Sequence, residues 1–411
     1  LAAHSDRPII STEYTHAYGN TGFGGLEARW KALTKHPSGT GAAIWMWADQ
    51  GIRTPVRNLQ KKNEDVHAGD DYLRIDYAGW DGIVDSYRNF TRDYWETKAV
   101  YAQVYPAVEK ISFTPGQDSL RIPIQNDFDF TDLTTVKIDW SIREDERVLA
   151  SGTNSITGQP HAESTFKLPV EALRTVRAGK TYYAWFVFTN VNGEEITRDA
   201  VELCPSVEQI GTVLPCGKIS VNQTETVTIE TGNIRYVFSP QTGQLISAEA
   251  QDKQLITDLR PIIWSPLDPC EKSAFGKENV RKAVDLNQYT TSVKEWSVED
   301  RLDCHVDSAN HFTTIYRYSI GVDGRLDVNY EILTDVAIPQ IPIVGMTIKT
   351  VPELKELHWL GLGPYDAYPN KKAAPILGVW GGEAGSADVT GMKATRWIER
   401  SNSECGFRIM S

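Results

Sequence analysis

The stretch Arg7-Pro-Ile-Ile-Ser-Thr-Glu-Tyr-Thr-His-Ala-Tyr-Gly-Asn20 joins a short apolar run to a carboxylate, an imidazole and a turn signal. Its first part, Pro8–Thr12, is short and largely β-branched, which predicts a buried strand. Glu13 then stands at the carboxyl end of that strand. Because burying a charge is costly unless the charge is paired or used, two interpretations stay open. Glu13 either forms an ion pair, with Arg7 or Arg29 as candidates, or takes part in chemistry.

The residues that follow predict a strand–helix–strand unit. Residues 22–36 predict a helix, because Leu26, Trp30 and Leu33 fall at helical spacing. Residues 41–49 form a near-continuous apolar run, which is typical of a parallel strand buried on both faces. This order implies a parallel sheet, and in barrels of parallel strands the chemistry lies at the carboxyl ends of the strands. Glu13 occupies such an end.

A long polar loop is expected over residues 50–77, and a closing helix over residues 93–105, ended by Pro106. From Ala107 the pattern changes to short alternating strands separated by turn residues. About one hundred residues of this kind predict a β-sandwich of immunoglobulin type. Residues 203–218 predict a linker.

Strands then dominate to the end of the chain, which predicts a large second β-sandwich. Hairpin turns are expected at Gly243 and at Asp323-Gly324. We expect this sandwich to be incomplete, because residues 407–411 resemble a strand that is cut short. The predicted strands are 226–230, 234–238, 312–320, 326–333 and 343–348.

Composition limits the classes of partner. The chain has 411 residues and a net charge of −12, with no dense block of Lys or Arg, so nucleic acids and anionic membranes are not expected as partners. No apolar run approaches the roughly 20 residues of a membrane span. Aromatic residues make up 10% of the chain, with 12 Trp and 17 Tyr, which suits either carbohydrate stacking or an aromatic core.

Four motifs carry a family resemblance. Residues 13–20 resemble the Glu-Tyr-x-His-Ala-x-Gly-Asn signature of the large microbial β-galactosidases of glycoside hydrolase family 2. Residues 45–50 resemble the Trp-Asp-Trp-x-Asp-Gln strand of that family. Residues 359–364, with Tyr368-Pro369, resemble the Trp-x-Gly-x-Gly-Pro motif of its last domain. Residues 126–133 resemble the Asn-x-x-x-Phe-x-x-Leu run of its preceding sandwich. The resemblance covers essentially the whole chain and corresponds to the C-terminal half of such enzymes.

The resemblance implies a multidomain fold. Residues 1–106 would be the C-terminal part of a (β/α)8 TIM barrel that forms the catalytic domain. Residues 107–206 would be an immunoglobulin-like β-sandwich, and residues 207–411 a large β-sandwich of the galactose mutarotase-like type.

The resemblance also implies retaining hydrolysis of terminal β-D-galactosides through a covalent glycosyl-enzyme. By motif match Glu13 is the nucleophile, His16 binds a sugar hydroxyl, Trp45 forms the floor under the sugar, and Asp81 stands where the family contacts the sugar. The residues alone leave other roles open: His16 as a structural imidazole and Trp45 as core packing. We expect Asp49 to pair or cap rather than to catalyse.

The chain departs from the family at several places. Met46 replaces an Asp between the two Trp residues, and Asp81 replaces an Asn, which puts both galactose specificity and the family's sodium site in question. The acid/base of the family is the Glu of an Asn-Glu pair on an earlier strand, and Asn63-Glu64 is in the wrong place for that role. We expect no metal in this chain, with the magnesium ligands upstream in the complete enzyme.

The expected partners are a β-galactoside or related carbohydrate, the N-terminal remainder of the same enzyme, and further copies in a homo-oligomer. The compartment stays open. We expect this chain, as a C-terminal fragment with the nucleophile alone, to be inactive by itself. Two rival functions are a family-2 exo-β-glycosidase of another sugar specificity and a non-catalytic carbohydrate-binding or assembly module.

Overall fold

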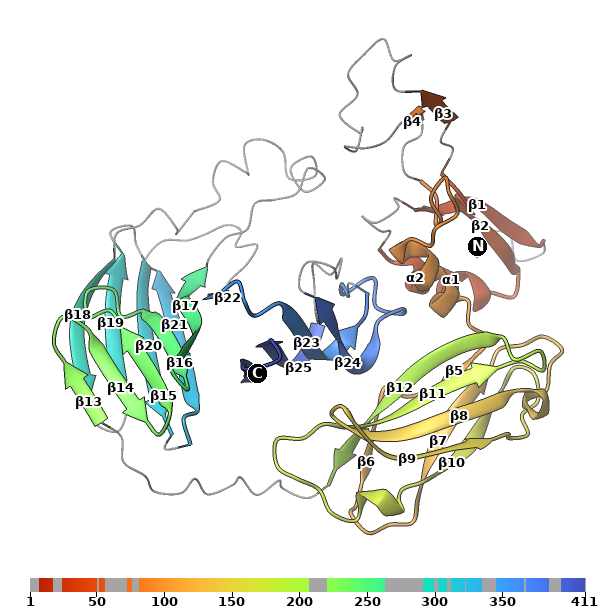
Figure 1. Cartoon of the computed structure of the whole chain (residues 1–411). Helices are drawn as coiled ribbons and strands as arrows, with labels where there is room; N and C mark the ends of the chain where they lie inside the picture. The colour runs from red at the N-terminus through yellow and green to blue at the C-terminus, as the bar shows by residue number, and fades with distance from the viewer. Residues whose placement is uncertain are drawn as a thin grey trace. The chain divides into compact units, whose positions relative to one another are not determined.

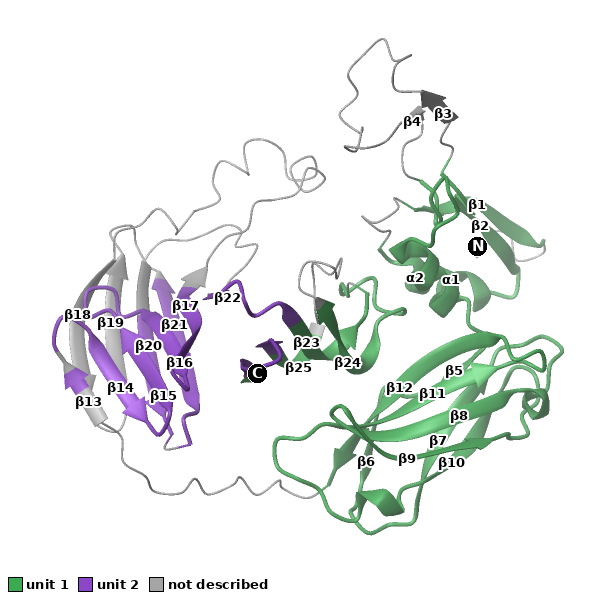
Figure 2. Cartoon of the chain, in the orientation of Figure 1, with its two compact units in different colours: residues 1–211, 357–398, 409–411 green, residues 212–356, 399–408 purple. Residues whose placement is uncertain are grey.

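The computed structural model consists mainly of β-strands and contains two compact units (Figures 1 and 2). The first unit comprises Leu1–Gly211, Leu357–Ile398 and Ile409–Ser411, and the second comprises Thr212–Glu356 and Glu399–Arg408. The structure describes residues 7–17, 24–49, 52–55, 72–75, 81–206, 220–262, 291–298, 302–308, 312–321, 323–334, 345–365, 367–383 and 393–410.

The first unit begins with the expected strand–helix–strand arrangement. Strand β1 (Ile9–His16) pairs in parallel with β2 (Gly39–Trp45), and helix α1 (Leu26–Thr34) connects them. The prediction of buried strands was wrong: Ile10 is 68% exposed, and β2 is also only partly covered. The reason is that these two strands form a sheet of two within the described residues, so no neighbouring strand covers their edges there, and Tyr14 and Ile44 are only partly buried where they pack near Leu26 of α1.

Two further expectations for this region need correction. Strands β3 (Ile52–Pro55) and β4 (Tyr72–Ile75) pair antiparallel inside the stretch that was predicted to be one polar loop. Helix α2 (Arg92–Val100) ends well before Pro106, because the chain enters strand β5 (Val104–Pro106), which pairs with β7. The side chain of Thr91 caps this helix by accepting a hydrogen bond from the backbone N–H of Asp93.

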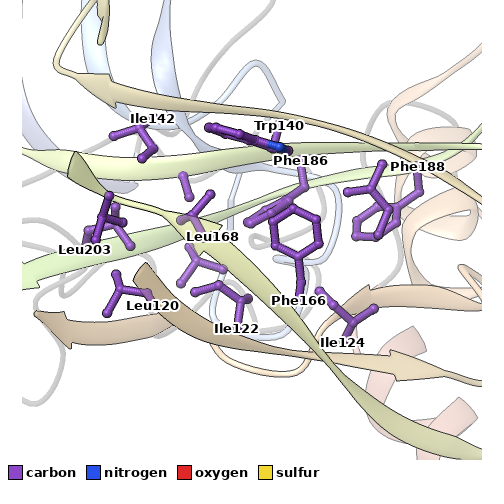
Figure 3. Packing of buried hydrophobic residues seen from close by; sticks show 14 of the residues in the cluster. Leu120, Ile122, Ile124, Trp140, Ile142, Phe166, Leu168, Phe186, Phe188 and Leu203 are labelled. Atoms are coloured by element: carbon purple, nitrogen blue, oxygen red, sulfur yellow. The ribbon is translucent and has the colours of Figure 1, made fainter. Parts of the chain in front are cut away.

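A β-sandwich follows, with a three-stranded sheet in the order β10-β7-β5 and a five-stranded sheet in the order β6-β12-β11-β8-β9. Alternating residues of both sheets form one buried core, in which side chains of β7 and β10 face those of β8 and β11 (Figure 3). Its elements are β6 (Lys110–Phe113), β7 (Ser119–Asn126), η3 (Leu133–Thr135), β8 (Lys137–Glu144), β9 (Arg147–Asn154), β10 (Ala162–Pro169), η4 (Glu171–Leu173), β11 (Tyr182–Thr189) and β12 (Glu195–Pro205).

Strand β11 is buried on both faces, which explains its near-continuous aromatic run. On its second face Tyr183 packs with Leu360, Leu377 and Trp397, which come from a further sheet in the order β24-β23-β25-β26. These strands are β23 (Glu356–Gly363), β24 (Ile376–Glu383), β25 (Lys393–Ser401) and β26 (Gly406–Met410). The residues expected to form a linker, 203–218, begin inside β12, which continues to Pro205. Residues 207–219 lie outside the described part.

The second unit contains a six-stranded sheet in the order β13-β14-β15-β16-β17-β22 and a four-stranded sheet in the order β18-β19-β20-β21. Tyr316 and Tyr318 of β20 share one core with Phe238 and Leu245, so the two sheets pack as a second sandwich. The strands are β13 (Ser220–Gln223), β14 (Val227–Thr231), β15 (Ile234–Phe238), β16 (Leu245–Ala250), β17 (Lys253–Ile262), β18 (Thr291–Val298), β19 (Leu302–Ser308), β20 (Phe312–Ile320), β21 (Leu326–Thr334) and β22 (Gly345–Thr350). The expected turns are confirmed, since Gly243 and Gly324 both have positive φ.

A charged group is buried at one end of the first sandwich. The carboxylate of Glu144 accepts hydrogen bonds of 2.8 Å from both the Arg177 Nε and the Tyr182 hydroxyl. The Arg177 guanidinium holds the pKa of Glu144 below its usual value. Since the folded-state pKa is depressed, this network stabilises the fold at neutral pH, and the stabilisation is lost as the pH falls through that pKa.

We predict that Glu144→Gln lowers the free energy of unfolding by about 1–2 kcal/mol at pH 7, because a charge-assisted hydrogen bond is lost. Differential scanning calorimetry of the chain should show this as a lowered transition temperature. The difference from wild type should shrink between pH 5 and pH 3. The exposed neighbour Glu146 provides the control, because Glu146→Gln should leave the transition unchanged. A Glu144→Gln difference that stays constant across this pH range would contradict the assignment.

Candidate active site

Strand β1 contains an irregularity at Glu13. Ser11 pairs with Ala42 and Thr15 with Ile44, so four steps along β1 match only two along β2. Glu13 has a φ of 50°, in the left-handed region, which costs a non-glycine residue about 1–3 kcal/mol. Bulges of this kind re-aim side chains and are frequent beside active sites. The sequence predicted that Glu13 follows the strand, whereas the structure places it inside the strand, at the bulge.

The bulge brings His16 next to Glu13. In a regular strand, residues three apart point to opposite faces, yet the His16 Nε2 lies 3.5 Å from the Glu13 Oε2. The Glu13 side chain is 55% exposed, so the carboxylate is open to solvent or substrate. His16 also pairs in register with Trp45, and their ring centroids are 6.2 Å apart. The structure thus gathers three of the four predicted site residues.

Tyr14 points elsewhere. Its hydroxyl lies 2.7 Å from the hydroxyl of Tyr101, at the end of α2. Burial, followed by this hydrogen bond, raises the pKa of Tyr14, so the phenol is neutral over the working range of pH. His16, and not Tyr14, therefore lies next to the Glu13 carboxylate.

Arg29 was a candidate ion-pair partner for Glu13. Its Nη1 donates a hydrogen bond of 2.8 Å to the Thr15 hydroxyl, and among the described residues no ion pair joins Arg29 to Glu13. The sequence analysis did not identify this contact. The signal that could have found it is the position of Arg29 on the helix that connects β1 to β2.

Asp81 lies beside the end of the Trp45 strand. The Met46 N–H donates to the Asp81 carbonyl at 2.7 Å, and the Ile83 N–H donates to the Met46 carbonyl at 2.9 Å. Asp81 is buried, at 6% exposure, and its carboxylate forms no ion pair with another residue in the described ranges. The backbone of Asp81 is therefore held next to Met46, the residue that directly follows Trp45.

Asp49 has the capping role that the sequence predicted. It is buried, and its Oδ1 accepts a hydrogen bond of 2.8 Å from the Gly82 N–H. A Cβ on Gly82 would lie 2.2 Å from the Asp49 backbone nitrogen and 2.3 Å from the Val84 carbonyl oxygen. Only glycine permits this close approach of two backbone segments, 46–49 and 81–84.

Some expected site features fall outside the described residues, namely Gly19, Asn20 and the Asn63-Glu64 pair. Within the described ranges, no group of three or more His, Cys, Asp or Glu is placed to hold a metal ion. No helix in that same part of the chain is long and apolar enough to cross a membrane.

Three family models match successive parts of the chain. The model described as "Glycosyl hydrolases family 2, TIM barrel domain" matches residues 2–105. "Beta-galactosidase, domain 4" matches residues 122–194, and "Beta galactosidase small chain" matches residues 230–390.

Curated relatives agree with these matches. A β-galactosidase of Pseudoalteromonas haloplanktis is 23% identical over 91% of this chain and 39% of its own length. A β-galactosidase of Lactobacillus delbrueckii subsp. bulgaricus is 25% identical over 92% of this chain and 37% of its own length. The chain thus spans less than two fifths of these relatives. A solved exo-chitosanase, CsxA of Amycolatopsis orientalis, matches at a TM-score of 0.21 and 10% identity, over 94% of this chain and 33% of that one.

The ordered matches show that successive parts of the chain are similar to glycoside hydrolase family 2, and the curated relatives are β-galactosidases, which confirms the resemblance seen in the motifs.

We predict that Gly82→Ala destabilises the segment around Asp81 by about 1–3 kcal/mol, because the added methyl group overlaps backbone atoms that cannot move aside. Chemical denaturation and the rate of limited proteolysis between residues 81 and 90 would measure this. Gly41→Ala in β2 is the matched control, since no described atom lies within 4 Å of its added Cβ. Equal behaviour of the two variants would contradict the close approach described here.

Proposed function

We propose that the chain supplies the nucleophile of a retaining exo-β-glycosidase, a β-galactosidase that hydrolyses terminal β-D-galactosides. The observation that carries the proposal is the Glu13 carboxylate, held in a left-handed bulge, exposed, and 3.5 Å from the His16 Nε2. A structural ion pair does not require such a backbone. The match to the family-2 barrel model and the similarity to β-galactosidases support the same function.

The proposed reaction has two steps. The Glu13 carboxylate attacks the anomeric carbon, while a carboxylic acid roughly 5–5.5 Å away protonates the departing oxygen. Water activated by that second carboxylate then releases the sugar with its anomeric configuration retained. In this scheme His16 binds a sugar hydroxyl, Trp45 stacks under the ring, and the Asp81 carboxylate accepts hydrogen bonds from hydroxyl groups.

We propose that the second carboxylate comes from the N-terminal remainder of a longer enzyme. The chain spans 39% of the length of the Pseudoalteromonas haloplanktis β-galactosidase. In this proposal the barrel-like part, residues 1–106, is the last section of a (β/α)8 TIM barrel. The exposed β1, with Ile10 at 68%, is consistent with a strand that further barrel elements cover. Residues 107–206 would be the immunoglobulin-like sandwich and residues 207–411 the galactose mutarotase-like sandwich.

The metals and the assembly are also proposals. Magnesium binding by residues upstream of this chain and a homo-oligomer are expectations for the complete enzyme, and Asp81 in place of the family's Asn puts the sodium site in question.

A second candidate function is exo-hydrolysis of another sugar, such as a β-glucoside or β-glucosaminide. The buried carboxylate of Asp81 favours it, because an acceptor-only group replaces the amide found at this position in the family. We predict that Asp81→Asn in the complete enzyme raises the ratio of kcat/KM for aryl β-galactosides over other aryl β-glycosides. A panel of such substrates measures the ratio, and an unchanged ratio would exclude Asp81 from sugar selection.

We predict that Glu13→Gln in the complete enzyme lowers kcat by roughly 10³-fold or more, because the amide cannot form the glycosyl ester. Folding should be intact, since Gln keeps the size and shape of Glu. The control is Glu27→Gln on α1, where a partly exposed ion pair with Lys31 is lost. Near-normal turnover by Glu13→Gln would reject the nucleophile assignment.

We further predict that the 411-residue chain alone does not hydrolyse an aryl β-galactoside. Normal turnover by the purified chain would show that both carboxylates lie within it. If residues 107–411 bound carbohydrate in calorimetry while the complete enzyme showed no turnover, a binding module would be the better description.

A further inference from the structure

A tight turn connects β23 to β24 and reaches the helices of the barrel-like part. The backbone groups of Tyr368 and Lys371 exchange two hydrogen bonds, of 2.9 Å and 3.0 Å, with Pro369 and Asn370 at the corner. We call residues 365 and 367–374 the bracing loop. The motif Tyr368-Pro369 lies within it, and the proposed reaction leaves this motif without a role.

The bracing loop binds α2 through buried charges. The Lys371 Nζ lies 2.6 Å from the Asp93 Oδ1, with the side chains 6% and 0% exposed. One turn further along α2, the Glu96 carboxylate accepts hydrogen bonds from the backbone N–H groups of Ala373 and Ala374, at 3.3 Å and 2.9 Å. Such an arrangement is specific in geometry, because each buried charge needs its own partner.

The two hydrogen bonds to Glu96 also offset part of the cost of burying its charge. Burial raises the pKa of Glu96, and the two N–H groups oppose that rise. Beside these polar contacts, the ring of Tyr365 stacks on Trp95 at a centroid distance of 5.5 Å. The bracing loop thus contacts Asp93, Trp95 and Glu96 of α2.

The same loop caps α1. Gly25 is the N-cap residue of α1 and offers no capping side chain. Its backbone N–H donates a hydrogen bond of 2.5 Å to the Asn370 carbonyl. The loop therefore supplies the acceptor that a capping-box side chain supplies in other helices.

Both helices hold the residues that directly follow Glu13. Arg29 of α1 donates to the Thr15 hydroxyl at 2.8 Å, and Tyr101 at the end of α2 is bonded to Tyr14 at 2.7 Å. The rings of Trp30 and Tyr101 also pack together, at 4.6 Å between centroids, and so join the two helices. A continuous set of contacts leads from Lys371 to the bulge that carries Glu13.

We propose that the bracing loop positions the nucleophile and that Lys371 is a positioning residue for Glu13. The proposal rests on the proposed function of Glu13. Removal of Lys371 breaks the buried ion pair that holds the loop on Asp93, so we expect α2 to shift, and Tyr14 and Thr15 to shift with it. A misplacement of about 1 Å at a reacting group can cost roughly 100-fold in rate, so the effect should appear in the bond-forming step.

The test uses the complete enzyme and a dinitrophenyl 2-deoxy-2-fluoro-β-galactoside. A Glu13 oxygen bonds to the anomeric carbon, and the bond from that carbon to dinitrophenolate breaks. The phenolate leaves with the electron pair and needs no proton. The fluorine slows the second step, so the glycosyl ester accumulates. Phenolate release gives the rate constant at saturation and the affinity, and peptide mass mapping gives the labelled residue.

We expect Lys371→Met to lower the rate constant at saturation by at least tenfold, while the affinity changes less than about twofold. Lys371→Arg should recover most of the rate, because it keeps the charge next to Asp93. The matched control is Lys372→Met: this neighbouring lysine is about half exposed, pairs only at the surface with Glu109, and should label at the wild-type rate.

Label on Glu13 with a wild-type rate in Lys371→Met would overturn the positioning role and leave the proposed function intact. Label on another residue of the wild-type enzyme would overturn the assignment of Glu13, and the positioning role with it. If Lys371→Met does not fold, Asp93→Asn combined with Lys371→Met removes the buried charge as well, and the same lowered rate is expected because the ion pair between the loop and α2 is still lost.

Discussion

The backbone of β1 at Glu13 is the constraint on which the candidate site depends. Two extra residues in β1, against the regular β2, break the alternation of side chains along the strand. This break puts His16 and Glu13 on one side, next to Trp45, whereas a regular strand would separate them. The left-handed φ of Glu13 costs free energy, so the surrounding contacts must hold it in place.

The residues that make those contacts lie far apart in the sequence. Tyr14 and Thr15 are bound by the two helices, and the helices are bound by the loop between β23 and β24. The same strands, β23 to β25, cover the outer face of β11 with Leu360, Leu377 and Trp397. The first unit is therefore one body in which a C-terminal sheet stabilises both the first sandwich and the helices next to Glu13.

Local patterns predicted much of this structure. Sequence patterns located five of the ten strands of the second sandwich, and glycine marked two of its turns, because both signals depend on neighbours in the sequence. The near-continuous aromatic run of β11 indicates burial of that strand on both faces, because an alternating pattern is expected only where one face is exposed. The candidate residues were found from a motif, and the structure gathers Glu13, His16 and Trp45 at one strand end. Their roles stay predictions.

The failures share a physical cause. Burial of β1 was wrong because burial depends on which layers cover a strand, and no pattern within the strand reports them. The bulge could not be predicted, since a positive φ at a glutamate has no propensity signal. The Lys371–Asp93 pair joins residues 278 positions apart, and each appears in the sequence as an ordinary surface charge.

The central claim is that Glu13 is the nucleophile, and chemical rescue tests it most directly. Glycine tolerates the positive φ at this position, so Glu13→Gly in the complete enzyme should fold. With a dinitrophenyl β-galactoside and added azide, the account predicts that turnover recovers and that the product is the α-galactosyl azide. The anomeric configuration can be read from proton NMR. A β-galactosyl azide would make Glu13 the acid/base instead, and absence of any rescue would contradict a catalytic role for this carboxylate.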